Sequence, residues 1–368
     1  MIKNKKRNSI LLAVAVVLFV IILFSVKYFG RQEENANIVG VIMPGSIREN
    51  GWNNVHYEGI SAACEELGVS IRLEENVSET YEECAPAIEK MAKEGANIII
   101  LVSYNYPQEV GDVIKSHPEI TFCCCDPTFN ADNYCAYFAR IYQTRYLAGI
   151  IAGLKTETNN IGYIAAMDTS EVNRGINAFA LGVHSVNPEA NVFVFRTNSW
   201  DNAEKEKDAT DKLVKGKNTD IVTYHQNQTN VIDEAEKLGI YSIGYHEVQK
   251  QYSEKYLTSV ICDWTKVYRE VIKECIQGKV KTNTNSVYWV GMEKEAVSLS
   301  EYSPALSESI KADVQQAADK IISGMEIFSG EIYDNQGTLR SSIGEAISDE
   351  ILLNKMDWLV EGVYIYEE

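Results

Sequence analysis

The sequence lacks the short motifs that mark common catalytic and nucleotide-binding sites. It contains no GxSxG, HExxH or GxxxxGK[ST] pattern, and no GxGxxG follows a predicted strand. None of its eight cysteines stands in CxxC spacing, which argues against a zinc site. We therefore expect a protein that is not an enzyme, with no catalytic residue, no cofactor and no metal.

Three of the cysteines are consecutive. Cys123, Cys124 and Cys125 lie on a predicted strand, where neighbouring side chains point to opposite faces. They are poor partners for one another, so we interpret the cysteines mainly as small buried hydrophobic residues.

Basic residues are scarce compared with acidic ones. The chain has 34 Lys and Arg against 52 Asp and Glu, a net charge of −18. Residues 1–30 hold five basic residues and no acid, so the rest of the chain is five charges more negative than the whole. Such a body repels phosphate backbones, which argues against nucleic acid as a partner. A solubilising surface explains the same composition, and the charge alone names no ligand.

One long hydrophobic run lies near the N-terminus. Ile10–Val26 is 17 residues with a single Ser, close to the lower limit for a membrane-spanning helix. The basic residues before it predict an inside N-terminus and an outside body. A cleaved secretory signal is the alternative, but no small-residue cleavage pattern follows, and the first cysteine that could accept a lipid is Cys64. We therefore expect residues 1–30 to be an uncleaved anchor in the cell membrane, with 31–37 as a linker to an extracytoplasmic body.

The rest of the chain alternates predicted strands and helices, which indicates an α/β fold with parallel sheets. At 368 residues it is long enough for two domains. "NIVGVIMPG" at Asn37 has a counterpart in "NIGYIAAMD" at Asn160, and "ANIIILVSYNY" has one in "TDIVTYHQNQ". The lag is 123 residues in both cases, and "ITFCCCDP" and "YSIGYHEV" form a third pair. This internal repeat predicts two similar lobes with a cleft between them.

In open parallel sheets, ligands bind beyond the carboxyl ends of the strands. The loops that follow the predicted strands are therefore the candidates for the walls of the cleft. They are residues 49–54, 103–107 and 126–129 in the first half, and 167–175, 197–202, 225–229 and 244–248 in the second.

These loops share one chemistry: they hold aromatic rings, amides, histidines and a few acids. Aromatic faces stack on flat heterocycles, at about 1–3 kcal/mol per base. Amides both donate and accept, so they can bind the edge of a purine or pyrimidine, and carboxylates can accept from sugar hydroxyls. The mixture predicts a neutral heterocycle, with or without a sugar, rather than an inorganic anion or a metal.

Each residue also has a structural interpretation. Trp52 could pack its turn against the following helix, and Asn53 could be an N-cap. Arg174 could cap a helix or bridge the lobes, and Trp200 could belong to the core at a strand end. The loop histidines could simply be hydrogen-bonded structural residues.

Several stretches resemble the basic membrane protein family, the solute-binding proteins of ABC importers that include purine nucleoside receptors. They are "GWNNVHYEG", "RIYQTRYLAGIIAG", "EVNRGINAFALGVHSVNPEA", "TNSWDNAEKE" and "MDWLVEGV". The resemblance runs from about Ile38 to the C-terminus. It implies a type I periplasmic-binding fold, in which two doubly wound parallel-sheet lobes close on the ligand.

The resemblance also implies roles for single residues. Trp52 would stack on the ligand, and Trp200 matches the aromatic of "NSW". Glu49 stands where the family commonly has Asp, and "CDW" at Cys262–Trp264 stands where relatives often have "WNW". His246 replaces a carboxylate that can hold ribose in nucleoside binders, which favours a free base over a nucleoside.

The family architecture implies lobes that are discontinuous in sequence. We expect lobe 1 to comprise residues 38–143 plus about 264–304, with strands near "VYWVG" and "AVSLS", and lobe 2 to comprise 144–263 plus about 305–368. The predicted ligand-binding residues are Glu49, Trp52, Asn53, Ser103, Tyr104, Asn105, Asp126, Arg174, Asn177, Trp200, His225, Gln226, His246 and Asp263.

The expected function is capture of a purine base or nucleoside for an ABC permease, by a monomer anchored through its N-terminal helix. The alternative is a membrane-anchored sensor of the same fold that reports ligand occupancy without transport. A DNA-binding repressor of this fold would need a DNA-binding headpiece, and the N-terminus has an apolar run instead.

Overall fold

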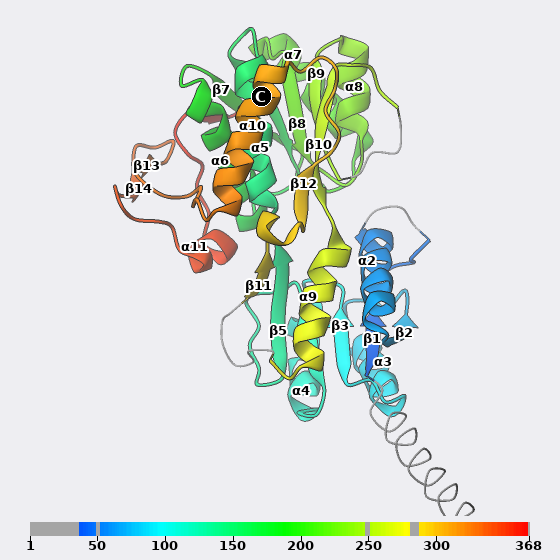
Figure 1. Cartoon of the computed structure of the whole chain (residues 1–368). Helices are drawn as coiled ribbons and strands as arrows, with labels where there is room; N and C mark the ends of the chain where they lie inside the picture. The colour runs from blue at the N-terminus through cyan, green and yellow to red at the C-terminus, as the bar shows by residue number, and fades with distance from the viewer. Residues whose placement is uncertain (1–36, 49–51, 247–250, 280–286, 367–368) are drawn as a thin grey trace, which may run out of the picture.

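The computed structural model describes residues 37–48, 52–246, 251–279 and 287–366, which form two α/β lobes (Figure 1). The expected anchor at residues 10–26 and the predicted site residue Glu49 lie outside the described residues. Within those four ranges, no helix has both the length and the apolarity needed to cross a bilayer.

The first lobe is built on a parallel sheet of order β11-β5-β4-β3-β1-β2. Its central strands are continuous apolar runs, such as "IIIL" in β3, because helices cover both faces of the sheet. The strands are β1 (Ile38–Ile42), β2 (Ser70–Glu74), β3 (Ile98–Leu101), β4 (Thr121–Cys124), β5 (Tyr134–Ala139) and β11 (Val287–Val290), and the helices are α2 (Trp52–Leu67), α3 (Tyr81–Lys93), α4 (Tyr106–Ser116) and α9 (Trp264–Ile276).

The second lobe has a sheet of order β12-β10-β9-β8-β6-β7-β15, parallel except for β12. Its strands are β6 (Asn160–Ala165), β7 (Asn191–Arg196), β8 (Ile221–His225), β9 (Tyr241–Tyr245), β10 (Tyr256–Cys262), β12 (Val297–Leu299) and β15 (Val363–Ile365). Its helices are α5 (Ile141–Lys155), α6 (Ser170–Val186), α7 (Ala203–Lys217), α8 (Asn230–Leu238) and α10 (Glu308–Ile322).

The two sheets repeat one topology. The first five strands of the first lobe lie in the spatial order β2-β1-β3-β4-β5, and those of the second in the order β7-β6-β8-β9-β10. Each strand therefore has a counterpart in the other lobe, as the lag of the internal repeat predicts. The carboxyl ends of both sets of strands face the junction between the lobes (Figure 1).

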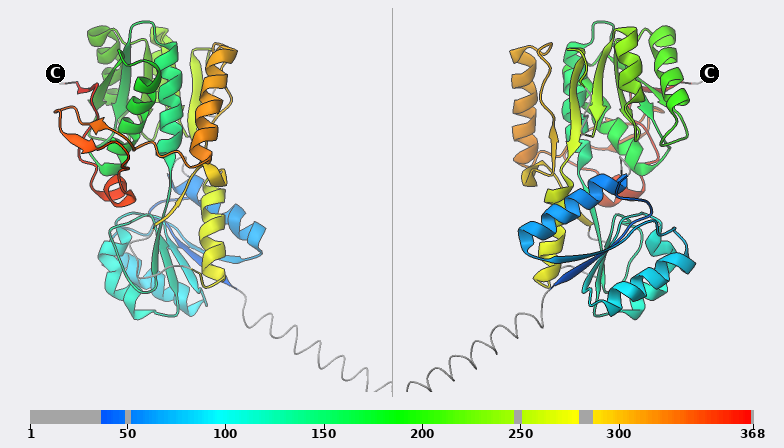
Figure 2. Two further views of the ribbon diagram at one scale, coloured as in Figure 1. Left: turned by 60° about the vertical axis from the view of Figure 1, so that its left-hand side comes forward. Right: turned by 90° about the vertical axis from the view of Figure 1, so that its right-hand side faces the viewer.

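The chain crosses between the lobes three times: after β5, after β10, and between β11 and β12. Figure 2 shows the lobes stacked one on the other, with the crossing segments near their junction. α9 and β11 lie with the first lobe, but "AVSLS" does not. Its strand β12 pairs antiparallel with β10, with Val260 opposite Leu299. By pairing with β10, β12 satisfies the backbone hydrogen-bonding groups at that edge of the second sheet. The third crossing therefore occurs before β12, at residues 291–296, and not near residue 304.

The segment after α10 runs along the side of the junction (Figure 2). It forms the small hairpin β13 (Ile332–Tyr333) and β14 (Leu339–Ser341), the short helix α11 (Asp349–Asn354), and finally β15 at the edge of the second sheet. Arg140, at the first crossing, forms an ion pair with Asp349 of α11 at 2.8 Å. The C-terminal segment is therefore held against both the second lobe and the junction.

Glycines set the closest helix contacts in each lobe. A Cβ on Gly182 of α6 would collide with the carbonyl oxygen of Tyr146 in α5, and one on Gly149 of α5 would collide with that of Phe179 in α6. In the first lobe, a Cβ on Gly59 of α2 would lie 2.7 Å from the Cβ of Trp264 in α9. These positions exclude any larger side chain because the partner is backbone or the root of a side chain.

Candidate functional site

A cleft of about 1040 Å³, including space open to solvent, lies between the lobes. Both lobes line it, and most of its residues follow the carboxyl ends of strands, as the strand-end rule predicts. The lining residues are Pro44, Trp52, Glu79, Ser103, Tyr104, Cys125 and Phe138 from the first lobe, and Glu171, Trp200, His225, Asn227, Tyr245 and His246 from the second.

Trp52, the first residue of α2, dominates the first-lobe wall. The residue is 37% exposed, although tryptophan is usually buried. The indole Nε1–H donates to the carbonyl oxygen of Val102 at 2.9 Å, which fixes the ring on the floor of the cleft. An exposed aromatic face that is held this firmly is a ready surface for stacking.

A buried column of rings supports Trp52 from behind. His56 lies between Trp52 and Trp264, with ring centroids 3.9 Å from each. Its Nδ1 is 2.6 Å from the Tyr268 hydroxyl, which is 2.8 Å from the hydroxyl of Tyr137. Burial, with a smaller contribution from His246, lowers the pKa of His56 well below its usual value, so the column is uncharged at neutral pH.

The second-lobe wall is a cluster of closely packed aromatic rings. His225 lies 5.8 Å from Trp200 and 4.7 Å from Tyr245, and Tyr245 lies 3.8 Å from His246. Trp200 is 36% exposed, whereas His225 is almost fully buried at the end of β8. This wall offers both an aromatic surface and imidazole nitrogens to whatever occupies the cleft.

Burial keeps the cleft histidines neutral. It lowers the pKa of His246 to about 4, helped by the nearby positive charge of Arg145. It lowers the pKa of His225 well below its usual value, and Arg145, His246 and Arg174 add to the effect. A neutral imidazole has one donor and one acceptor, so both residues can hydrogen-bond to an uncharged ligand without an ionic partner.

Two charged side chains belong to the second-lobe wall, one buried behind it and one lining the cleft. Arg145 of α5 is fully buried, 4.3 Å from the Tyr245 ring, and its Nε and Nη2 have no hydrogen-bond partner among the described residues. The Glu171 carboxylate lies 3.7 Å from His225 Nε2. Withdrawal from solvent raises the pKa of Glu171, against the pull of Arg174 and Arg145. The wall therefore combines neutral rings and the Glu171 carboxylate, which lines the cleft, with the Arg145 guanidinium buried behind them.

Of the residues predicted to bind ligand, six line this cleft. They are Trp52, Ser103, Tyr104, Trp200, His225 and His246. Arg174 lines a smaller adjoining recess of about 350 Å³, which shares Tyr104, Cys125, Phe138 and Glu171 with the cleft.

Two predicted residues on α6 are used to hold other parts of the chain. Arg174 Nη1 donates to the carbonyl oxygen of Leu352 in α11 at 2.5 Å, and its guanidinium lies 5.0 Å from the ring of Trp289 in the first lobe. Asn177 donates to the carbonyl oxygen of Trp358 and accepts from the backbone N–H of Val360, both at 2.9 Å. Asn177 is fully buried and does not line the cleft.

Two predicted acids stabilise turns and do not line the cleft. Asp126 is fully buried and accepts from the backbone N–H and the hydroxyl of Thr128, at 2.7 and 2.6 Å. Asp263 is the N-cap of α9 and accepts from the backbone N–H of Thr265 and Lys266. Their carboxylates are already occupied by backbone donors, which is the ordinary role of Asp at turns and helix starts.

The three predicted amides also lie outside the lining of the cleft. Asn105 Nδ2 donates to Glu79 at 3.3 Å, and Gln226 Nε2 donates to the Thr197 hydroxyl at 2.9 Å. Asn53 sits in the first turn of α2 with a buried Oδ1 that has no partner among the described residues.

Several lining residues are not among those predicted from the sequence. Glu171, Asn227 and Tyr245 lie in stretches predicted to line the cleft, so only the choice of residues within each stretch is incomplete. Phe138 is inside β5, and Glu79 precedes α3. Only the three-dimensional fold brings these two residues to the cleft. Across the described parts of the chain, no group of three metal-ligating side chains lies in the cleft.

Comparison with known proteins gives one family. The family described as "ABC transporter substrate-binding protein PnrA-like" matches residues 36–334. A purine-binding protein of Brucella abortus is 31% identical over 329 residues, covering 88% of this chain and 92% of that protein. A putative ABC transporter glucose-binding protein of Haloferax volcanii is 29% identical over 335 residues, covering 90% and 81%.

Solved structures share the fold at low identity. A transcriptional activator of the comK gene from Bacillus halodurans superposes with a TM-score of 0.69 at 22% identity, over 78% of this chain and 98% of that one. A solute-binding protein of an ABC transporter system from Conexibacter woesei does so with a TM-score of 0.61 at 16% identity, over 78% and 97%.

Proposed function

This chain belongs to the family of PnrA-like ABC transporter substrate-binding proteins, which are not enzymes, and from this premise we propose that it captures a purine base or nucleoside for an ABC importer. The observation that carries the proposal is the placement of exposed aromatic rings from both lobes in one cleft. Trp52 and Tyr104 come from the first lobe and Trp200 from the second. Flat heterocycles are the ligands that such paired surfaces suit.

The polar groups of the cleft fit the same ligand class. His225 and His246 are neutral, so their nitrogens can donate to and accept from the edge of a base. Glu171 supplies one carboxylate acceptor beside His225. The purine-binding relative from Brucella abortus supports this choice, whereas the putative glucose-binding relative from Haloferax volcanii makes a sugar the competing ligand.

The mechanism we propose is closure of the lobes on the ligand. Three crossings join the lobes, and each lobe supplies one wall of the cleft. A ligand that touches both walls stabilises the closed arrangement, so binding and closure are coupled. His246 in place of a carboxylate leaves fewer acceptors for ribose, which favours a free base over a nucleoside.

The proposal includes a place in the cell. The hydrophobic run at residues 10–26 would hold a monomeric body at the outer face of the cell membrane, next to the permease that receives the ligand. Residues 31–37 would be the linker.

A thermal-shift and calorimetry series on the full chain tests the ligand class. Adenine, guanine, hypoxanthine, adenosine, guanosine and glucose are compared at equal excess. A ligand present at about 1,000 times its Kd should stabilise the fold by roughly 4 kcal/mol. We expect the bases to give the largest shifts. A shift with glucose alone would replace the purine by a sugar and leave the solute-binding role intact.

The second candidate function is sensing without transport. The transcriptional activator protein med of Bacillus subtilis is 24% identical over 77% of this chain. Deleting the gene for this chain distinguishes the two functions. Loss of purine uptake supports delivery to an importer, and unchanged uptake with altered purine-dependent gene expression supports sensing.

A further inference from the structure

Three cysteine sulfurs meet inside the first lobe, away from the cleft. Cys123 of β4 and Cys135 of β5 are directly opposite in the parallel register, and their Sγ atoms are 3.1 Å apart. Cys275, near the end of α9, places its Sγ 3.6 Å from that of Cys123. All three sulfurs lie within 4.8 Å of one another.

These separations are close to those of a metal–thiolate centre. With metal–sulfur bonds of about 2.3 Å, three thiolates around one ion are roughly 3.8–4.0 Å apart. The sulfurs here span 3.1 Å to at most 4.8 Å, so adjustments of less than about 1 Å would produce that geometry. The three sulfurs come from two strands and a helix, and ordinary core packing does not require them to converge in this way.

The donor set also selects the kind of ion. Cys123 and Cys135 are buried, whereas Cys275 is partly exposed and leaves a route for entry. No fourth Cys, His, Asp or Glu joins the group among the described residues, and the undescribed stretch 280–286 contains none of these residue types. Soft thiolates prefer soft cations, and structural Zn²⁺ normally requires four ligands.

We propose that Cys123, Cys135 and Cys275 form a three-thiolate site for a soft d¹⁰ cation, Cu(I) in preference to Zn(II). Each sulfur that bonds to the ion releases its thiol proton, and no electron is transferred. The ion would tie the β4–β5 pair to α9. That helix begins at Trp264, which packs on His56 behind the Trp52 ring, so the first lobe as a whole would gain stability.

The test uses the full chain, purified under anaerobic reducing conditions and titrated with Cu(I) against a competing chelator of known affinity. We expect one ion per chain, a sulfur-to-metal charge-transfer absorption, proton release, and a rise in melting temperature. A parallel titration with Zn(II) should show weaker binding, because three sulfurs leave its fourth position to solvent.

Single variants test whether all three sulfurs take part. Cys123→Ala, Cys135→Ala and Cys275→Ala should each weaken Cu(I) binding at least 100-fold, because even lost outer-shell partners of a metal cost roughly 10–100-fold. Cys64→Ala is the matched control, since Cys64 is buried in the same lobe outside the cluster. Melting temperatures measured without metal show whether each variant folds. If Cys275→Ala does not fold, Cys275→Ser replaces it, because serine has nearly the same volume as cysteine.

Three results would overturn the site. They are no stoichiometric ion in the full chain, equal loss of affinity in Cys64→Ala, and a peptide map that shows a disulfide between two of Cys123, Cys135 and Cys275. None of these outcomes depends on which solute the cleft binds.

Discussion

The two lobes have the same order of strands, yet they present different walls to the cleft. The first lobe offers Trp52 on a buried column of uncharged rings. The second places its rings, two of them neutral imidazoles, in front of the buried Arg145. One topology therefore fixes where the walls stand, and the residues at the strand ends decide what each wall can bind. The first lobe has the features of a stacking platform, and the second has those of polar recognition.

The largest effects are expected on stability, and one of them is at the helix contact of the second lobe. Gly182→Ala drives a Cβ into the Tyr146 carbonyl and should cost at least about 1–3 kcal/mol of stability, as overpacking does. Gly59→Ala crowds Trp264 in the first lobe and should cost a similar amount. Differential scanning calorimetry measures both.

The two glycine variants should differ in ligand binding. Gly59→Ala disturbs the column behind Trp52 and should also weaken affinity, whereas Gly182→Ala should not. The control is Gly216→Ala in the exposed part of α7, where a Cβ would meet only the end of the Tyr366 side chain, 3.2 Å away. If Gly182→Ala destabilises the protein no more than Gly216→Ala, α5 and α6 can separate without cost, and stability does not depend on their close contact.

Asn177 is expected to matter for stability and not for recognition. Asn177→Ala leaves the Trp358 carbonyl and the Val360 N–H without their buried partner, at a cost of about 1–3 kcal/mol for each unsatisfied group. The melting temperature should fall while ligand affinity, measured well below the melt, stays within about twofold. If Asn177→Ala loses more affinity than Trp52→Ala, Asn177 has a role in ligand binding and this prediction is wrong.

Sequence patterns are enough to predict the repeat, the parallel sheets and the loops that line the cleft. Local periodicity determines strands and helices, and strand ends determine where a ligand can bind. The partners of particular side chains do not follow from such patterns. Asn177 binds a carbonyl 181 residues along the chain, so only the folded chain shows that it clamps the C-terminal segment.

Two other features were beyond the sequence for the same reason. The three residues of β12 carry no local sign of which sheet they join, and the open edge of β10 decides it. The cysteine cluster comes from β4, β5 and α9, so no spacing motif marks it.

Removing the stacking platform should have the next largest effect. Trp52→Ala should weaken purine binding at least tenfold, about 1.4 kcal/mol, with little change in the melting temperature of the free protein because the ring is partly exposed. Trp52→Phe keeps an aromatic face and loses the bond to Val102, so its affinity should be intermediate. Isothermal titration calorimetry measures both. Unchanged affinity in Trp52→Ala would transfer the stacking role to the second lobe, where Trp200→Ala tests it.

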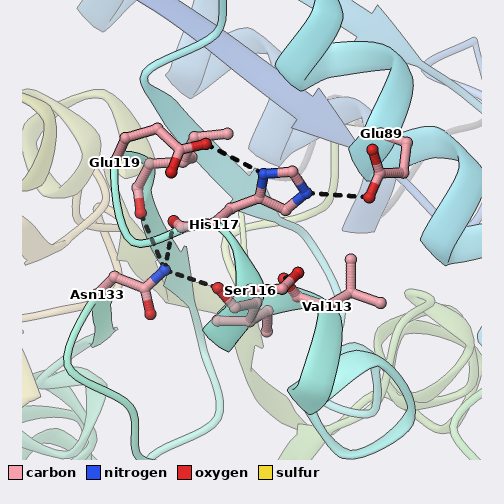
Figure 3. Close-up of polar contacts among 8 residues, drawn as sticks. Glu89, Val113, Ser116, His117, Glu119 and Asn133 are labelled. Atoms are coloured by element: carbon pink, nitrogen blue, oxygen red, sulfur yellow. Dashed lines mark hydrogen bonds and ion pairs between the residues drawn. The ribbon is translucent and has the colours of Figure 1, made fainter.

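The histidines of the cleft and the histidine at the far end of the first lobe differ in the direction of their pKa shifts. Figure 3 shows His117 between two carboxylates, with Nε2 3.0 Å from Glu89 and Nδ1 3.1 Å from Glu119. Asn133 ties this corner together by donating to the carbonyl oxygens of Ile114, His117 and Ile120. Glu89, followed by Glu119, raises the pKa of His117, whereas burial lowers that of His225.

The two shifts predict opposite pH dependences. His117 binds its proton more tightly when folded, so its contribution is complete below about pH 6.5, the unfolded value, and is lost as the pH rises through the folded pKa. His225 stabilises above that pH, and its contribution is lost on acidification. In urea titrations across this range, His117→Asn should lose stability mainly at acidic pH, by under about 1 kcal/mol because its partners are exposed. His225→Asn should instead reduce the loss of stability on acidification. If the change in unfolding free energy caused by the two substitutions varied with pH in the same direction, the two environments would not differ as described.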